Sequence, residues 1–136
     1  MEFSVLMSVY IKEKPQYLKE ALQSVFDQTV VPTEVVVVMD GVLTDELEQV
    51  ISFFQEREKN LKVIPLPQNM GLGKALQIGL QHCQYELVAR MDSDDICKPN
   101  RFEKQLEFMA YHPEIAVVGC WVEEFSHVKE QIESIR

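Results

Sequence analysis

Apolar residues along the chain follow two alternating spacings, which predict β-strands and α-helices in turn. Short apolar runs occupy residues 3–9, 34–39, 61–66, 86–91 and 115–121. In stretches between these runs, apolar residues recur every three or four positions, as at Leu47, Val50, Ile51 and Phe54. That spacing is typical of a helix with one buried face. Strands that alternate with helices predict an α/β fold with a parallel sheet and right-handed crossovers.

The predicted helices begin at residues that favour helix starts. Pro15 and Pro99 suit the first position of a helix, and the second of these helices is expected to reach about His112. Thr44 can cap the helix that follows it. A further helix over residues 71–83 carries an unbroken apolar stripe, formed by Leu72, Ala75, Leu76, Gly79, Leu80 and Cys83.

Composition and charge exclude some classes of protein. Of the 136 residues, 46% are hydrophobic and 26% charged, which is ordinary for a soluble globular domain. No apolar run approaches the roughly 20 residues that span a bilayer, and the first residues lack the basic start of a signal peptide, so we expect a cytoplasmic location. Thirteen basic and 22 acidic residues give a net charge of −9, which opposes nucleic-acid binding. A bound nucleotide would need a metal ion between its phosphates and the acidic chain.

Polar and glycine residues follow four of the predicted strands, at the point where each strand ends. In an open parallel sheet, ligands bind outside the carboxyl ends of the strands, where the strand order reverses. Residues far apart in the sequence are therefore expected to meet at one edge of the sheet. They are Ser8, Tyr10, Asp40, Asn69, Gly71, Asp92 and Asp94.

Three carboxylates, Asp92, Asp94 and Asp95, lie within four positions directly after the fourth predicted strand. Carboxylate oxygens are ligands for Mg²⁺ and Mn²⁺, and such ions complete their coordination with substrate phosphates. The pattern predicts a divalent metal site that includes Asp92 and Asp94. The alternative is a turn in which Asp95 lies near the next helix start and accepts backbone N–H groups. An EF-hand is excluded because Cys97 stands where that loop requires glycine.

Three further positions near the strand ends have more than one interpretation. Asp40 precedes Gly41, and it either forms a tight turn or hydrogen-bonds the base or ribose of a nucleotide. Gly71 opens a helix without the spacing of a phosphate-binding loop, and we expect it to permit close approach of the backbone. Arg90 falls between two positions expected to be buried, so it needs a partner, either the carboxylates or a diphosphate.

A series of sequence blocks occurs in an order that is specific to one enzyme family. The blocks are SVLMSVY, SVFDQT, EVVVVMDG, QNMGLGKALQIGL, YELVARMDSDDICKPNRFEKQLEF and IAVVG. Over residues 3 to about 125 they resemble the nucleotide-sugar-binding half of family 2 glycosyltransferases with the GT-A fold. The resemblance implies a Rossmann-like three-layer sandwich with a mainly parallel sheet, the GT-A half-domain, over residues 1–125. Residues 126–136 would be the start of a missing acceptor half or a tail.

The resemblance also implies roles for residues by position. Asp92-Ser-Asp94 matches the family's D-x-D motif, in which the aspartates hold a divalent metal that bridges the two phosphates of a nucleotide-sugar. Asp94 would be the direct metal ligand, and Asp92 would reach the metal or the ribose. Asp40 matches the strand-end aspartate that hydrogen-bonds the base. The remaining nucleotide-binding matches are Ser8, Tyr10, Asn69 and Gly71.

The activity implied by the resemblance is metal-dependent sugar transfer with inversion. The donor would be a nucleoside diphosphate sugar, expected to be a UDP-sugar, and the acceptor a saccharide or a lipid-linked molecule, for polysaccharide or cell-envelope glycan synthesis. The cofactor would be Mn²⁺ or Mg²⁺, and the full-length enzyme would associate peripherally with the inner face of the membrane. The acceptor half and the catalytic base of the family are expected to lie outside this chain, which alone would be inactive.

Two other functions remain open from the residues. The chain could bind nucleotide-sugar and metal without turnover, as a truncated binding module. Asp92 could instead be the nucleophile of an aspartyl-phosphate domain, because an acidic pair after a strand also suits that chemistry. The identity of the sugar, the nucleotide and the acceptor, and the oligomeric state, do not follow from the sequence.

Overall fold

The computed structural model describes residues 2–111, in which four strands and four helices alternate. The strands are β1 (Ser4–Val9), β2 (Glu34–Met39), β3 (Leu61–Pro65) and β4 (Val88–Arg90). The helices are α1 (Pro15–Phe26), α2 (Asp45–Arg57), α3 (Leu72–Gln81) and α4 (Arg101–Tyr111). No helix within residues 2–111 is both long and apolar enough to cross a membrane. The strand predicted at 115–121 and the domain boundary expected near residue 125 lie outside the described residues.

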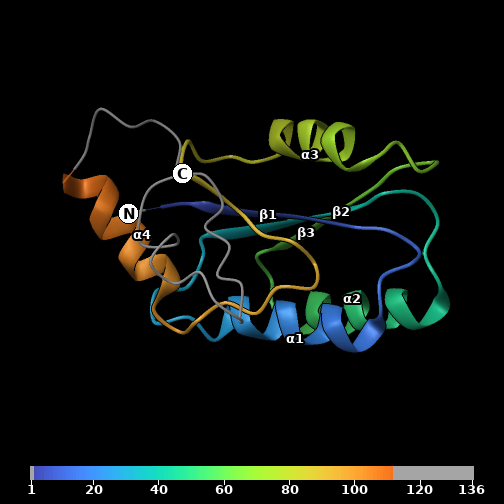
Figure 1. The fold of residues 1–136 in the computed structure, drawn as a ribbon, viewed down its shortest axis with the longest axis horizontal. Coiled ribbons are helices and arrows are strands. Elements are labelled where there is room, and N and C mark those ends of the chain that lie inside the picture. Colours follow the sequence, from blue (N-terminus) through green and yellow to red (C-terminus); the bar gives the residue numbers. More distant parts are fainter. Residues whose placement is uncertain (1, 112–136) are drawn as a thin grey trace, which may run out of the picture.

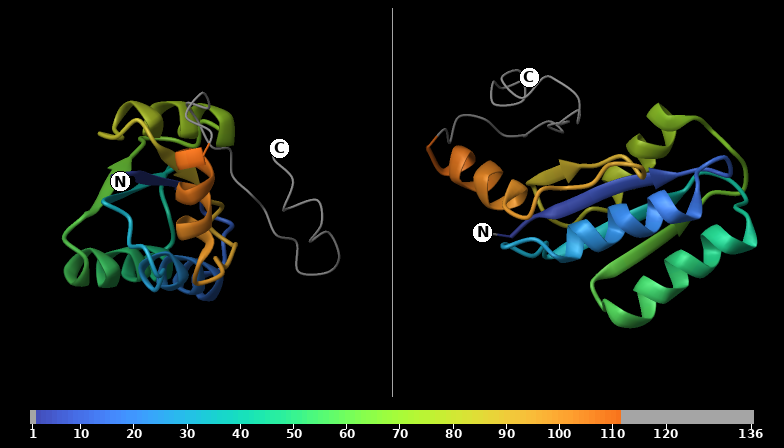
Figure 2. Two further views of the ribbon diagram at one scale, coloured as in Figure 1. Left: turned by 90° about the vertical axis from the view of Figure 1, so that its left-hand side faces the viewer. Right: turned by 60° about the horizontal axis from the view of Figure 1, so that its bottom comes forward.

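The four described strands form one parallel sheet in the order β3-β2-β1-β4. The chain builds outward from β1 to β3 on one side and then places β4 on the other side of β1, so the strand order reverses between β1 and β4. Helices α1 and α2 cover one face of the sheet and α3 covers the other (Figures 1 and 2). Helix α4 lies near the amino end of β1 (Figure 1). The α/β class and the parallel sheet between helical layers are confirmed.

Strand β2 is buried on both faces, as its run of valines predicts. The four valines at 35–38 are all 0% exposed. The first and third belong to the main core, which includes side chains of α1 and α2. The second and fourth belong to a smaller cluster with Leu6 and Ala75, below α3. A strand covered by helices on both faces has no polar face, which explains the continuous apolar run.

Helix α3 buries only part of its apolar stripe. Ala75 and Gly79 are buried against the sheet, but Leu72 and Leu80 are 52% and 53% exposed. A Cβ atom on Gly79 would lie 2.6 Å from side-chain atoms of both β1 and β2. The helix therefore approaches the sheet on its small residues, and the two leucines remain outside that narrow contact. The apolar stripe that the sequence predicts is therefore only partly buried, and Leu72 and Leu80 remain exposed.

Helix α4 begins at Arg101, two residues later than the sequence predicts. The carbonyl oxygen of Pro99 accepts a hydrogen bond of 2.7 Å from the N–H of Thr29, in the loop after α1. The side chain of Gln28 donates to the carbonyl oxygen of Lys98 at 2.6 Å. In a helix that began at Pro99, the Pro99 carbonyl would serve an N–H four residues later. Because it is used for a tertiary contact instead, the helix starts after it.

Glu34, at the start of β2, ties together the amino ends of the strands. It is 6% exposed, and its carboxylate accepts hydrogen bonds from Ser4 Oγ at 2.7 Å and from the N–H of Gln84, with Lys62 Nζ 3.3 Å away. Burial raises the pKa of Glu34, but these donors outweigh it and hold the pKa below its usual value of 4.5. Burial and the Glu34 charge raise the pKa of the Cys83 thiol to about 11. This edge is therefore a hydrogen-bonded network with a protonated thiol near neutral pH.

Candidate functional site

A pocket of about 370 Å³ opens at the carboxyl ends of the strands. The residues that line it are Ser8, Tyr10, Glu13, Asp40, Asn69, Gly71, Leu72, Asp92, Ser93 and Asp94. The seven residues predicted for the site are all in this set, and Glu13, Leu72 and Ser93 are additional. The pocket is bordered by the loops that follow β1 and β4, between which the strand order reverses, as expected for a ligand site in an open sheet.

The loop after β1 forms one wall of the pocket. Ser8 is the last but one residue of β1 and is 9% exposed, whereas Tyr10 follows the strand and is 45% exposed. The carbonyl oxygen of Tyr10 accepts a hydrogen bond of 3.0 Å from the N–H of Glu13, which closes a tight turn. The turn places Tyr10 and Glu13 along the same pocket.

Asp40 joins the loops that follow β2 and β3. It is 4% exposed, and its Oδ1 atom accepts a hydrogen bond of 2.7 Å from the N–H of Met70. The side chain of Asn69 donates to the carbonyl oxygen of Asp40 at 3.4 Å. The carboxylate of Asp40 therefore holds the 69–71 loop against the end of β2, in addition to lining the pocket.

Two glycines in these loops have positive φ angles, but their surroundings differ. Gly41 has φ +91°, and a Cβ atom on it would lie 2.6 Å from the backbone nitrogen of Asn69. Gly71 has φ +93°, and within residues 2–111 no atom outside its chain neighbours lies within 4 Å of where its Cβ would be. Within the protein, the close backbone approach that was expected at Gly71 thus occurs at Gly41. Gly71 is explained by its backbone angle, which other residues rarely adopt.

The loop after β4 brings the three carboxylates together. Ligand oxygens of Asp92, Asp94 and Asp95 all lie within 4.8 Å of one another. Burial, and then the charges of Asp92 and Asp94, raise the pKa of Asp95 above its usual value. The helix start that the alternative places near Asp95 lies six residues further on, because α4 begins at Arg101. A turn is nevertheless present, since the N–H of Asp95 donates to the carbonyl oxygen of Asp92 at 3.2 Å. In this turn the three carboxylates form a compact acidic group, of which Asp92 and Asp94 line the pocket.

The donor set of this group fits a divalent cation that prefers oxygen ligands. A Mg²⁺ ion about 2.1 Å from each ligand separates opposite ligand oxygens by about 4.2 Å. The three carboxylate oxygens are within 4.8 Å of one another, so small rotations of the side chains would allow them to share one ion. Oxygen-only ligands favour Mg²⁺ or Mn²⁺ over zinc, which takes nitrogen and sulfur ligands more readily.

Arg90 has the carboxylate partner that its sequence position predicts. Its neighbours Ala89 and Met91 are 7% and 0% exposed, whereas the Arg90 side chain reaches solvent. Its Nη2 atom lies 3.5 Å from Oδ1 of Asp92. An exposed ion pair of this kind adds little stability. It does place one positive charge next to the acidic group.

Ser93 and Glu13 are the polar residues of the site that sequence reasoning missed. Ser93 is 7% exposed, and its hydroxyl donates a hydrogen bond to Oε2 of Glu13. The two residues are 80 positions apart, and neither belongs to a periodic pattern. The one available signal was the presence of a small hydroxyl residue between Asp92 and Asp94.

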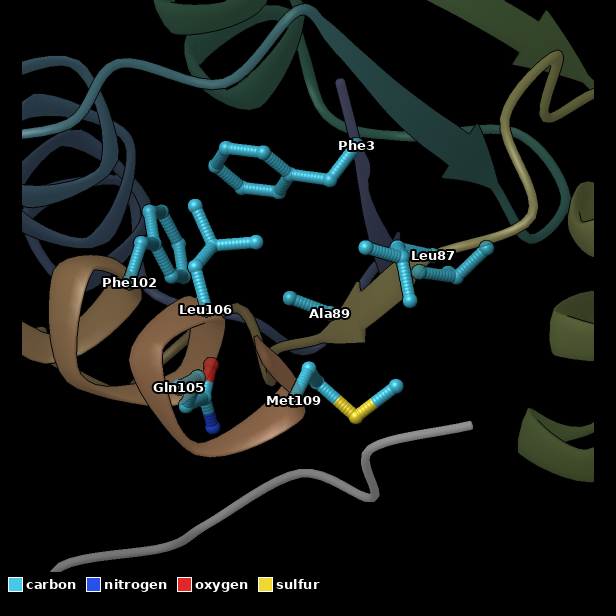
Figure 3. Close-up of a pocket in the computed structure, with 8 residues that line it drawn as sticks. Phe3, Leu87, Ala89, Phe102, Gln105, Leu106 and Met109 are labelled. Carbon is cyan, nitrogen blue, oxygen red and sulfur yellow. The ribbon is translucent and has the colours of Figure 1, made fainter. Parts of the chain in front are cut away.

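A second pocket, between β4 and α4, is apolar and small (Figure 3). Phe3, Leu87, Ala89, Leu106 and Met109 point toward one another there. Its free volume is about 20 Å³, which is room for about one water molecule. It is a packing gap rather than a candidate ligand site.

Comparison with known proteins identifies related chains. The sequence profile described as Glycosyl transferase family 2 matches residues 4–136. An uncharacterized glycosyltransferase of Haemophilus influenzae is 52% identical over the whole chain. The UDP-Gal:alpha-D-GlcNAc-diphosphoundecaprenol beta-1,3-galactosyltransferase of Escherichia coli is 49% identical over 91% of the chain. The amylovoran biosynthesis glycosyltransferase AmsE of Erwinia amylovora is 46% identical over 98% of it. The chain spans 51%, 45% and 50% of the lengths of these three relatives.

Solved structures share the fold. TarS 1–349 of S. aureus in complex with UDP-GlcNAc superposes with a TM-score of 0.71 at 35% identity, over 83% of this chain and 32% of that one. A mannosyltransferase of Pyrobaculum calidifontis in complex with GDP-Man and Mn²⁺ superposes with a TM-score of 0.69 over 80% of this chain and 32% of that one. At 23% identity, the second likeness concerns the fold alone.

Proposed function

The chain belongs to glycosyl transferase family 2, as its sequence motifs predicted, and on that premise we propose that it is the donor-binding half of a sugar transferase. The donor is a nucleoside diphosphate sugar, which the full-length enzyme transfers with inversion to a saccharide or lipid-linked acceptor. Residues 1–125 form the nucleotide-sugar-binding half, and residues 126–136 lead into the part of the enzyme that contacts the acceptor.

The charge of the pocket is the observation that carries this proposal. Among residues 2–111, the lining includes four acidic residues, Glu13, Asp40, Asp92 and Asp94, and no lysine or arginine. A diphosphate carries negative charge and would be repelled from such a wall. A divalent cation between the carboxylates and the phosphates reverses that repulsion. The acidic pocket is therefore suited to a nucleotide that arrives with Mn²⁺ or Mg²⁺.

Each loop around the pocket has a part in this proposal. Asp94 would hold the metal ion directly, and Asp92 would reach the metal or the ribose. The carboxylate oxygen of Asp40 that does not accept the Met70 N–H is the acceptor for the base. The other residues that contact the nucleotide are Ser8, Tyr10, Asn69 and Gly71. When bound, the metal supplies positive charge that stabilises the diphosphate leaving group.

The deprotonation of the acceptor requires a base that these residues do not include. Asp92 and Asp94 would be committed to the metal or the ribose, Asp40 accepts a backbone N–H, and Glu13 accepts the hydroxyl of Ser93. We place the base and the acceptor site in the half of the relatives that this chain does not span. The 136-residue chain should therefore bind donor and metal with little or no turnover, which is the behaviour of a binding module.

Named ligands of similar proteins support a uridine nucleotide and a lipid-linked acceptor. The E. coli relative is named for UDP-Gal and a diphosphoundecaprenol acceptor, and TarS was solved with UDP-GlcNAc. AmsE is named for amylovoran biosynthesis. We extend these to a role in polysaccharide or cell-envelope glycan synthesis. The full-length enzyme would then work in the cytoplasm, bound peripherally at the inner face of the membrane.

Thermal unfolding with UDP and Mn²⁺ tests this function. A ligand at 100 times its Kd stabilises the folded chain by about 2.7 kcal/mol, which raises Tm by roughly 10 °C for a domain of this size. The double variant Asp92→Ala/Asp94→Ala should lose the Mn²⁺-dependent part of the shift. Glu56→Gln, which removes an exposed carboxylate of α2, is the matched control and should keep the full shift. An equal shift in the double variant would contradict the assignment of the metal to these aspartates.

A further inference from the structure

The hydrogen bond between Ser93 and Glu13 joins the loops that follow β4 and β1, both of which line the pocket. We propose that Glu13 is a positioning residue, which sets the arrangement of Asp92 and Asp94 by holding the serine between them. The inference rests on the proposed metal-binding role of the two aspartates, and it concerns residues to which the family motif gives no role.

The loop that carries the carboxylates is anchored at both ends. At one end, the N–H of Met91 donates to the carbonyl oxygen of Leu6 at 2.9 Å. At the other end, the N–H of Cys97 donates to Ser24 Oγ at 2.9 Å. The sulfur atoms of Met91 and Cys97 lie 3.2 Å apart and close the base of the loop. Between these anchors, residues 92–94 line the pocket.

Ser93 ties this segment to the other wall. It is 7% exposed, and its neighbours Asp92 and Asp94 both line the pocket. A hydrogen bond from Ser93 to Glu13 therefore fixes the backbone between the two aspartates. Hydrogen bonds to a charged acceptor are shorter and stronger than neutral ones. Loss of this bond would leave the aspartates on a loop that is held mainly at its base.

The geometry of Glu13 suits positioning rather than metal binding. Its Oε1 atom accepts a hydrogen bond of 2.9 Å from the N–H of Lys14, and its Oε2 atom accepts the hydroxyl of Ser93. Both carboxylate oxygens thus already have donors. The close group of ligand oxygens found in residues 2–111 consists of Asp92, Asp94 and Asp95, without Glu13.

Glu13 also links the carboxylates to the nucleotide side of the pocket. Its N–H closes the turn that begins at Tyr10. A shift of Glu13 would therefore displace the Tyr10 loop as well as the Ser93 loop. The two walls of the pocket are coupled through one side chain.

The test compares variants of the 136-residue chain by two measurements. The first is the Kd for Mn²⁺ alone, from the electron paramagnetic resonance signal of the free ion. The second is amide hydrogen exchange of residues 92–96 without metal, which reports local opening of the loop. The variants are Ser93→Ala, Glu13→Ala, their combination, and Glu13→Gln, whose amide oxygen can still accept the serine hydroxyl.

Ser4→Ala is the matched control. It also removes a hydrogen bond from a buried serine hydroxyl to a glutamate, here Glu34, but at the opposite end of the strands. It should lower Tm and leave both the Mn²⁺ affinity and the exchange of residues 92–96 unchanged. A general loss of stability is thereby separated from loss of positioning.

Positioning predicts a specific pattern. Ser93→Ala and Glu13→Ala should each weaken Mn²⁺ binding about tenfold, equivalent to about 1.4 kcal/mol, and the double variant no further. Exchange of residues 92–96 should increase in all three, while Glu13→Gln should stay within about threefold of the wild type in Kd. Independent, additive losses, or equal losses in Glu13→Gln and Glu13→Ala, would overturn the proposal. If the wild-type chain bound no Mn²⁺, the metal assignment would fail, and the exchange data would still decide whether Glu13 orders the loop.

Discussion

Alanine at Gly41 should destabilise the chain more than alanine at Gly71, although both glycines have nearly the same φ angle. The angles are +91° and +93°. Around Gly71 there is open space, whereas a Cβ on Gly41 would lie 2.6 Å from the backbone nitrogen of Asn69. The pair therefore separates the cost of the backbone angle from the cost of the close contact.

The magnitudes follow from these contacts. An alanine held in a sparsely populated backbone region costs about 1–3 kcal/mol, and this applies at both positions. At Gly41 the backbone of Asn69 must also move. The next residue is Met70, whose N–H donates to Asp40 at 2.7 Å, so the same movement weakens that hydrogen bond. Weakening a hydrogen bond to a charged group costs up to about 1.5–3 kcal/mol. Gly41→Ala should therefore lose about 1.5–3 kcal/mol more than Gly71→Ala.

Urea unfolding followed by circular dichroism measures both free energies of unfolding. Gly71→Ala is the internal control, because it shares the backbone angle and lacks the contact. Losses that agree within about 0.5 kcal/mol would refute the reasoning, since such a difference is within the usual scatter of surface substitutions. A Gly41→Ala chain that fails to fold while Gly71→Ala folds would agree with it.

Three further predictions concern the packing of α3 and the amino edge of the sheet. Gly79→Ala should lower the free energy of unfolding, measured in urea, by up to about 2 kcal/mol, because overpacking against β1 and β2 exceeds the gain in helix propensity. A more stable variant would show that α3 does not lie this close to the sheet. The pKa of Glu34 is lowered in the folded chain, so its carboxylate should stabilise the fold above the usual value of 4.5. This stabilisation should be lost as the pH falls through the folded pKa, and urea titrations in acid should show a smaller loss for Glu34→Gln. Cys83 should be alkylated slowly at neutral pH, and Glu34→Gln should lower its thiol pKa from about 11. Mass spectrometry of the Cys83 peptide measures the alkylation rate against pH, and an unchanged thiol pKa in the variant would refute the electrostatic coupling.

The local pattern of the sequence predicted the elements of the described chain and their class. The valines at 35–38 could be assigned to a strand covered on both faces, because an uninterrupted apolar run leaves no polar face for water. The same strand assignments predicted which loops share the carboxyl edge, and so brought Asp40, Asn69 and Asp92 to one pocket. Because the carboxyl ends of parallel strands meet at one edge of the sheet, this convergence can be predicted without side-chain contacts.

Contacts between distant segments could not be predicted in this way. The start of α4 at Arg101 depends on the Pro99 carbonyl being used by Thr29, and the exposure of Leu80 depends on how closely α3 approaches the sheet at Gly79. Both depend on distances between elements. A periodic pattern states which face of an element is apolar, but it contains no information about how far away the next element lies.

The sequence by itself determined an α/β chain of glycosyl transferase family 2 with its polar residues at one edge of a parallel sheet. Only the tertiary structure decided that Gly41 lies against Asn69 and that Glu13 holds Ser93 between two aspartates. Residues 13 and 93 are 80 positions apart. They meet because β4 pairs with β1, which brings the loops that follow these two strands together. Strand pairing converts local patterns into a sheet edge, and the packing of loops on that edge then fixes each side chain.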